Sequence, residues 1–96
     1  MAEQLKITNN EEASRFETTV EGAVAYASYD LEDGRIVFTH TIVPSELAGR
    51  GIANQLAKAG LDHARSKGLG VVPQCSFIAK YIERNPEWKE LVTTSE

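Results

Sequence analysis

The sequence holds a single cysteine, Cys75, which excludes an internal disulfide and is typical of a chain kept in a reducing compartment. It lacks a long apolar run, so we expect neither a membrane-spanning segment nor a secretory leader, and we expect a cytoplasmic protein. It also lacks a cluster of cysteine and histidine side chains, because only two histidines accompany the cysteine, and a zinc site is not expected.

Positive charge is scarce as well. Ten lysines and arginines face fourteen acidic residues, which gives a net charge of −4 without a basic tail or stripe. Nucleic acid and anionic membranes are therefore poor candidate partners, and an anionic ligand would have to be held by local geometry. A chain of 96 residues is enough for one domain, residues 1–96, with one modest core, present as a monomer or a weak dimer.

Alternating apolar residues predict three strands in the first half of the chain, at 16–20, 23–29 and 35–43. Glu21-Gly22 and Asp33-Gly34 are typical of the tight turns that join antiparallel strands. The third predicted strand carries apolar side chains on both faces, which indicates a central strand covered on both sides. Simple alternation places His40 on one face with three apolar residues, Ile36, Phe38 and Ile42.

The second half predicts helix, strand and helix. An apolar arc runs from Ile52 to Lys67, with Gly60 in its middle, where a missing side chain would let the helix approach the sheet closely. Gly68 would end this helix, and a short buried strand would follow at 69–73, parallel to the third strand. A second helix would begin at Cys75 or Ser76, reach about residue 84, and lead into a closing turn at 86–92. The fold class is therefore α/β or α+β, with a mixed antiparallel and parallel sheet flanked by helices.

The glycine-rich turn at 47–53, with the sequence LAGRGIA, lies between a predicted strand and a helix. Glycines at a helix start leave backbone N–H groups bare, which together with the helix dipole make a phosphate or pyrophosphate site. The alternative is that they only fit the turn, since the spacing matches neither the dinucleotide fingerprint nor a P-loop. Arg50 is either an additional cation for this site or a solvated loop charge.

Cys75 follows a buried strand at or just before a helix start, a position that favours the thiolate. The alternative is a small buried hydrophobic residue. Because ligands lie beyond the carboxyl ends of strands in α/β sheets, we expect Cys75 and the glycine-rich turn to face each other across one cleft. His40 is either a base at neutral pH or a hydrogen-bonded histidine of the core.

Side chains of the second predicted helix also have two interpretations. Tyr81 either points its phenol into the cleft or packs against the core. Lys80 and Arg84 either meet outlying phosphates or form a solvated helix face.

Four blocks together resemble the small, single-domain branch of the GNAT acetyltransferases. They are HTIVP at 40–44, the glycine-rich turn, VVPQCSF at 71–77 and YIERNPEW at 81–88, and the resemblance covers residues 37–92. The first position of the family's pyrophosphate turn is Ala48 here, whose side chain offers no contact. The resemblance implies a truncated GNAT-like fold that lacks most of the elements around the acceptor pocket.

The resemblance also implies that the chain binds acetyl-CoA or coenzyme A. Pyrophosphate would rest on the amides of the glycine-rich turn, and the pantetheine arm would pair with the third strand. The thioester would end near Cys75, and transfer to a small amine or a protein lysine would use His40 as a base or pass through an acetylated Cys75. The alternatives are a coenzyme A-binding module without catalysis and a thiol-based hydrolase or redox sensor. The cofactor-binding residues implied in this way are Ile42, Val43, Gly49, Arg50, Gly51, Ile52, Ala53, Ser76 and Tyr81.

Overall fold

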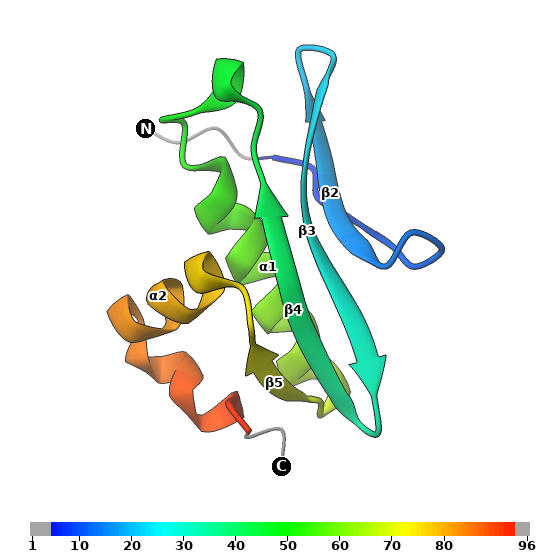
Figure 1. Cartoon of the computed structure of the whole chain (residues 1–96), viewed down its shortest axis with the longest axis vertical. Coiled ribbons are helices and arrows are strands. Elements are labelled where there is room, and N and C mark those ends of the chain that lie inside the picture. Colours follow the sequence, from blue (N-terminus) through cyan, green and yellow to red (C-terminus); the bar gives the residue numbers. More distant parts are fainter. Residues whose placement is uncertain (1–4, 94–96) are drawn as a thin grey trace.

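The computed structural model describes residues 5–93, which form one five-stranded sheet with two helices (Figure 1). The strands follow one another in the sheet in the same order as in the sequence. They are β1 (Thr8–Asn10), β2 (Arg15–Val20), β3 (Ala23–Glu32), β4 (Arg35–Ile42) and β5 (Gly70–Pro73). The helices are α1 (Ile52–Lys67) and α2 (Ser76–Arg84), with short 3-10 helices η1 (Ser45–Leu47) and η2 (Pro86–Leu91).

The sheet is mixed, which confirms the predicted fold class. Strands β1 to β4 pair antiparallel, whereas β4 and β5 pair parallel because α1 connects them as a crossover. β4 therefore lies between β3 and β5, as its apolar content predicted. β1 was not predicted, because its three residues are all polar and it forms only by pairing with β2.

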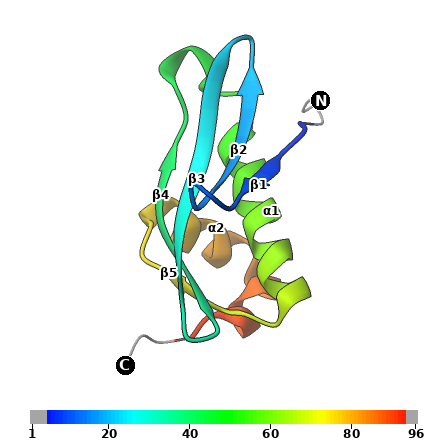
Figure 2. The same ribbon diagram turned by 90° about the vertical axis from the view of Figure 1, so that its right-hand side faces the viewer.

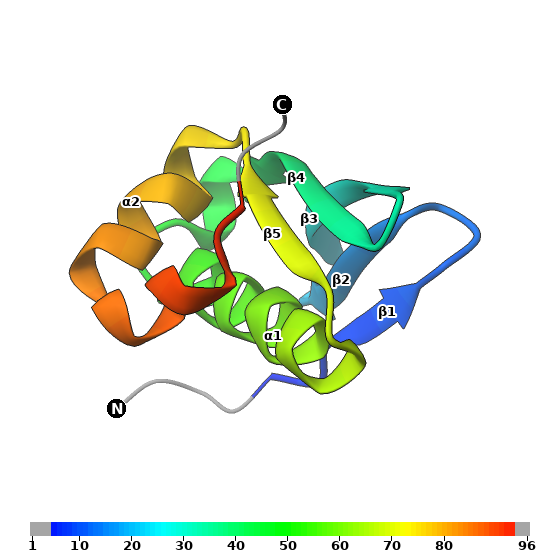
Figure 3. The same cartoon turned by 90° about the horizontal axis from the view of Figure 1, so that it is seen from below.

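The core lies between α1 and one face of the sheet (Figure 2). Alanines 25 and 27 of β3 are fully buried, and their small side chains leave room for the helix. Gly60 allows the closest approach, since a Cβ atom there would lie 2.7 Å from Cε1 of Phe38. The close packing predicted at Gly60 is thus confirmed. Figure 3 shows α1 running along the sheet and α2 beside the edge strand β5.

A β-bulge in β4 changes the direction of its side chains. The pairing with β3 shifts register between Ser28, which opposes His40, and Tyr29, which opposes Phe38. Thr39 is the extra residue. Because successive residues of β3 lie on opposite faces and opposed residues share a face, His40 lies on the face opposite to Phe38.

The bulge corrects two predictions for this strand. Simple alternation had placed His40 and Ile42 on the same face as Ile36 and Phe38, which is wrong because the extra residue reverses the order of the faces. β4 is buried on both faces only over residues 36–38, while His40 is exposed and Ile42 is 45% exposed. The interpretation of His40 as a histidine of the core is therefore wrong.

The predicted helix boundaries are confirmed. Gly51 and Gly68 flank α1 in the left-handed conformation, with φ of 75° and 69°, and the Gly68 amide donates to the carbonyls of Ala64 and Arg65. The predicted closing turn is η2, which anchors Trp88 in the core at 2% exposure. None of the helices within residues 5–93 has the length and apolar character to cross a membrane.

Candidate functional site

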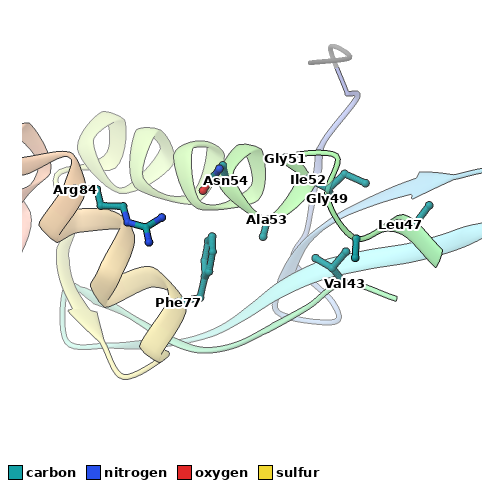
Figure 4. Close-up of a pocket in the computed structure, with 10 residues that line it drawn as sticks. Val43, Leu47, Gly49, Gly51, Ile52, Ala53, Asn54, Phe77 and Arg84 are labelled. Carbon is teal, nitrogen blue, oxygen red and sulfur yellow. The ribbon is translucent and has the colours of Figure 1, made fainter. Parts of the chain in front are cut away.

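A pocket of about 290 Å³ lies between the first turn of α1 and one face of α2 (Figure 4). One wall is the segment from the end of β4 through the glycine-rich turn into α1, and α2 supplies the other. The lining residues are Val43, Leu47, Ala48, Gly49, Gly51, Ile52, Ala53, Asn54, Phe77 and Arg84.

The glycine-rich turn leaves the start of α1 open to this pocket. Gly49 and Gly51 have φ of 84° and 75°, and a Cβ atom at either would meet nothing within 4 Å. The amide of Gln55 is bonded to the Gly51 carbonyl at 3.2 Å, so the amides of residues 52–54 precede the hydrogen-bonded part of the helix. No side chain caps this end and its first turn carries no acidic residue. The positive end of the helix dipole is therefore available for an anion.

The side chain of Arg50 is turned away from the pocket. Its guanidinium binds both carboxylate oxygens of Glu21, at 3.2 and 3.3 Å, and so ties the glycine-rich turn to the hairpin between β2 and β3. Arg50 does not line the pocket. Its contribution to an anion site would come from its backbone amide and from holding the turn in place.

The opposite wall is the face of α2 that carries Phe77 and Arg84. These residues are seven apart, which is two helical turns, and Figure 4 shows both side chains projecting toward α1. Arg84 supplies the only charged side chain among the lining residues. Of the two interpretations of Arg84, contact with outlying phosphates fits its place in the pocket lining better than a purely solvated helix face does.

Tyr81 lies on the same face of α2, four residues after Phe77, but it does not line the pocket. Its ring packs half-buried against the core. Burial raises the pKa of the Tyr81 phenol, with further increases from the carboxylates of Glu87 and Asp62. The phenol is consequently protonated at neutral pH and can donate a hydrogen bond.

Cys75 sits where β4, β5 and α2 meet. Its side chain is 7% exposed, and its sulfur lies 3.3 Å from Oγ1 of Thr41, while its amide donates to the Phe38 carbonyl at 2.8 Å. The packing of the thiol therefore fits the interpretation of Cys75 as a small buried hydrophobic residue. Cys75 does not line the pocket, and its amide is already bonded.

The end of β4 runs beside the pocket with an open edge. Pairing between β4 and β5 stops at Phe38 and Pro73, whereas β4 continues to Ile42. Within the described part of the chain, no further strand pairs with β4 on that side. The backbone of residues 39–42 therefore faces the gap between the two diverging strands, and Val43 follows directly as a lining residue.

The structure brings together some of the predicted site residues and separates others. Five of the residues predicted to bind a cofactor line the pocket, namely Val43, Gly49, Gly51, Ile52 and Ala53. Ile42, Arg50, Ser76 and Tyr81 do not. His40 lies on the exposed face of β4, whereas Thr41, the next residue, contacts Cys75.

Sequence reasoning missed part of the lining. Leu47 and Ala48 belong to the predicted glycine-rich turn but were not named as binding residues, and they complete the wall before the glycines. Asn54, the third residue of α1, was missed. Phe77 was missed, whereas Arg84 had been interpreted either as a contact for outlying phosphates or as part of a solvated helix face. Their spacing of seven puts both on one face of a helix. The spacing does not say what this face of α2 packs against. The position of α1 is needed before the face can be recognised as the wall of a pocket.

Comparison with known proteins gives one consistent result. The family model described as GCN5-related N-acetyl-transferase matches residues 15–91. Protein NATD1 from Mus musculus is 34% identical over 85 residues, which cover 85% of this chain and 77% of that protein. Protein NATD1 from Homo sapiens is 44% identical over 59 residues, or 60% of this chain and 52% of that protein. The solution structure of a GCN5-like putative N-acetyltransferase from Staphylococcus aureus superposes with a TM-score of 0.73 at 28% identity, covering 96% of this chain and 91% of that one.

Proposed function

The chain belongs to the GCN5-related N-acetyltransferase family, and we propose that it transfers an acetyl group from acetyl-CoA to an amine. One observation carries the proposal, namely the pocket that the uncapped start of α1 shares with Phe77 and Arg84 of α2. Such an arrangement suits a ligand that has a diphosphate beside an apolar and aromatic part.

The diphosphate would rest on the amides from Arg50 to Asn54, where the helix dipole and the bare N–H groups favour negative charge. The open edge of β4 supplies backbone groups for the amide units of the pantetheine arm, which carries the thioester. This edge leads from Val43 back toward Thr41 and Cys75. The acetyl group would therefore arrive near the point where β4 and β5 diverge.

In the proposed reaction the amine nitrogen attacks the acetyl carbonyl carbon, the carbon–sulfur bond breaks, and the proton lost by the amine ends on the coenzyme A sulfur. The amine is that of a small molecule or a protein lysine. Direct attack is supported by the packing of Cys75, whose thiol is 7% exposed and outside the pocket. His40 lies on the exposed face, where it would first accept the proton from an amine that approaches over that face and then release it through solvent to the coenzyme A sulfur.

The route through an acetylated cysteine makes a different prediction. If the acetyl group passes through Cys75, then Cys75→Ala abolishes transfer and mass spectrometry finds acetylated wild-type protein after incubation without an acceptor. We expect Cys75→Ala to retain transfer. His40→Gln should lower kcat strongly while leaving the Kd for acetyl-CoA unchanged, because His40 does not line the pocket.

The proposed cofactor site can be tested with two matched glycines. Gly51 and Gly34 have nearly the same φ, 75° and 78°, and a Cβ atom at either position meets nothing within 4 Å. Alanine at either therefore carries a similar conformational cost of about 1–2 kcal/mol in stability. Only Gly51 lines the pocket. Calorimetric titration with acetyl-CoA should show wild-type affinity for Gly34→Ala and strongly weakened binding for Gly51→Ala.

Equal affinity of both variants for acetyl-CoA would mean that the ligand does not contact the start of α1, and the site assignment would be wrong.

Turnover is then measured as coenzyme A release with a panel of small amines and lysine peptides. A second candidate function is a coenzyme A-binding module without catalysis. It is favoured because His40 and Cys75 are separated across β4, so these two side chains do not form one catalytic group. Tight binding of acetyl-CoA, with no release of coenzyme A above the rate in buffer alone, would support the binding module and overturn the proposed acetyl transfer.

A further inference from the structure

Arg84 differs from the other arginines of the described chain. Arg15 and Arg50 each bind a glutamate, the Arg65 guanidinium lies 4.2 Å from the centre of a tryptophan ring, and Arg35 is also engaged. Within residues 5–93, no acidic group is paired with Arg84. Its fork of N–H donors is therefore available for a ligand, and it projects into the pocket (Figure 4).

The position of Arg84 separates it from the amides of the glycine-rich turn. It is the last residue of α2 and lies two turns, or about 10 Å along the helix axis, beyond Phe77. Figure 4 shows Phe77 between Arg84 and the glycine-rich turn. The pocket thus has two places for negative charge, the start of α1 at one end and the guanidinium at the other, with an aromatic ring between them.

Coenzyme A has a matching distribution of charge. Its diphosphate is separated by the ribose from a second group, the 3′-phosphate, and adenine extends from the same ribose. A phosphate monoester carries close to two negative charges at neutral pH, and the net charge of −4 on this chain repels it unless a local cation is present. A guanidinium binds such a group with two parallel hydrogen bonds.

We propose that Arg84 recognises the 3′-phosphate of coenzyme A and makes the protein prefer coenzyme A to 3′-dephospho-coenzyme A. This inference rests on the proposed function, because it assumes that the diphosphate occupies the start of α1. Phe77 then packs against the adenosine between the two phosphate sites. Arg84 acts in binding and has no role in the transfer of the acetyl group.

The test is a set of titrations with coenzyme A and 3′-dephospho-coenzyme A. Three proteins are compared, the wild type, Arg84→Gln and the control Lys80→Gln. Lys80 is exposed on the same helix one turn earlier and does not line the pocket, so this control removes an equal charge from the same element. We expect the wild type and Lys80→Gln to prefer coenzyme A by about tenfold, as for one charge-assisted contact, and Arg84→Gln to bind both ligands equally.

Two results would overturn the role of Arg84. One is a wild type that binds both ligands with the same Kd. The other is an Arg84→Gln variant that weakens both ligands by the same factor, which would place the guanidinium on the diphosphate. If the wild type binds neither ligand, the proposed function itself fails and the inference fails with it, so the two failures are distinguishable.

Discussion

Gly60 is the position where one added methyl group tests the packing of α1 against the sheet. A Cβ atom at Gly60 would lie 2.7 Å from Cε1 and 2.8 Å from Cζ of Phe38. These distances are too short for carbon atoms in contact. The Phe38 ring is fully buried, and its ring centre lies 6.5 Å from those of Phe16 and Tyr29, so it has little room to move.

Two opposing contributions decide the stability of Gly60→Ala. Overpacking of a buried ring costs about 1–3 kcal/mol. Alanine in place of glycine inside a helix recovers roughly 1 kcal/mol of helix propensity. We therefore expect a net loss of about 1 kcal/mol in the free energy of unfolding. For a domain of this size, this corresponds to a melting temperature lower by about 4–8 °C.

Urea unfolding followed by circular dichroism measures this loss. The double variant Gly60→Ala/Phe38→Leu is the companion measurement, because the smaller leucine removes the atoms that the new methyl group meets. The destabilisation of the double variant should be less than the sum of the two single losses. A Gly60→Ala protein more stable than the wild type, or losses that simply add, would refute the close contact between Gly60 and Phe38.

Two further predictions concern pH and the glycine-rich turn. Burial raises the pKa of Tyr29 and Tyr81 above their ordinary value of 10.0, so the unfolded phenols lose protons first and the free energy of unfolding falls as pH rises past 10. Urea unfolding at about pH 8 and about pH 11 should show a lower free energy of unfolding at the higher pH, with a smaller decrease in Tyr81→Phe. An equal decrease in that variant would contradict the contribution of Tyr81. The exposed Glu21–Arg50 pair should contribute at most about 1 kcal/mol to stability in a double-mutant cycle, and a coupling above about 2 kcal/mol would show that the pair is not exposed as described.

Local signals explain why the helices were predictable. α1 is bounded by Gly51 and Gly68, whose positive φ angles mark both of its ends, and its apolar arc faces the core. Parallel pairing of β4 and β5 followed from the general handedness of strand–helix–strand units. The helix signals lie between neighbouring residues, and the pairing of β4 with β5 needed only the order strand, helix, strand, so the local pattern was sufficient for both.

The features that were missed depend on residues far apart in the sequence. The bulge at Thr39 appears only in the register with β3, and it moves His40 from the predicted face to the exposed one. β1 exists only because β2 offers it an edge. Phe77 was missed as a pocket wall and Arg84 kept two interpretations, because both depend on how α2 packs against α1, and neither helix encodes that arrangement by itself.

The central claim, that the start of α1 holds the diphosphate of coenzyme A, is tested most directly by backbone amide NMR during a titration with coenzyme A. We expect the largest chemical-shift changes on the amides of residues 49–54, with changes also at Phe77 and Arg84. The amides of the hairpin between β3 and β4, around Gly34, should not move. An absence of shifts at millimolar coenzyme A, or changes confined to another part of the chain, would contradict it.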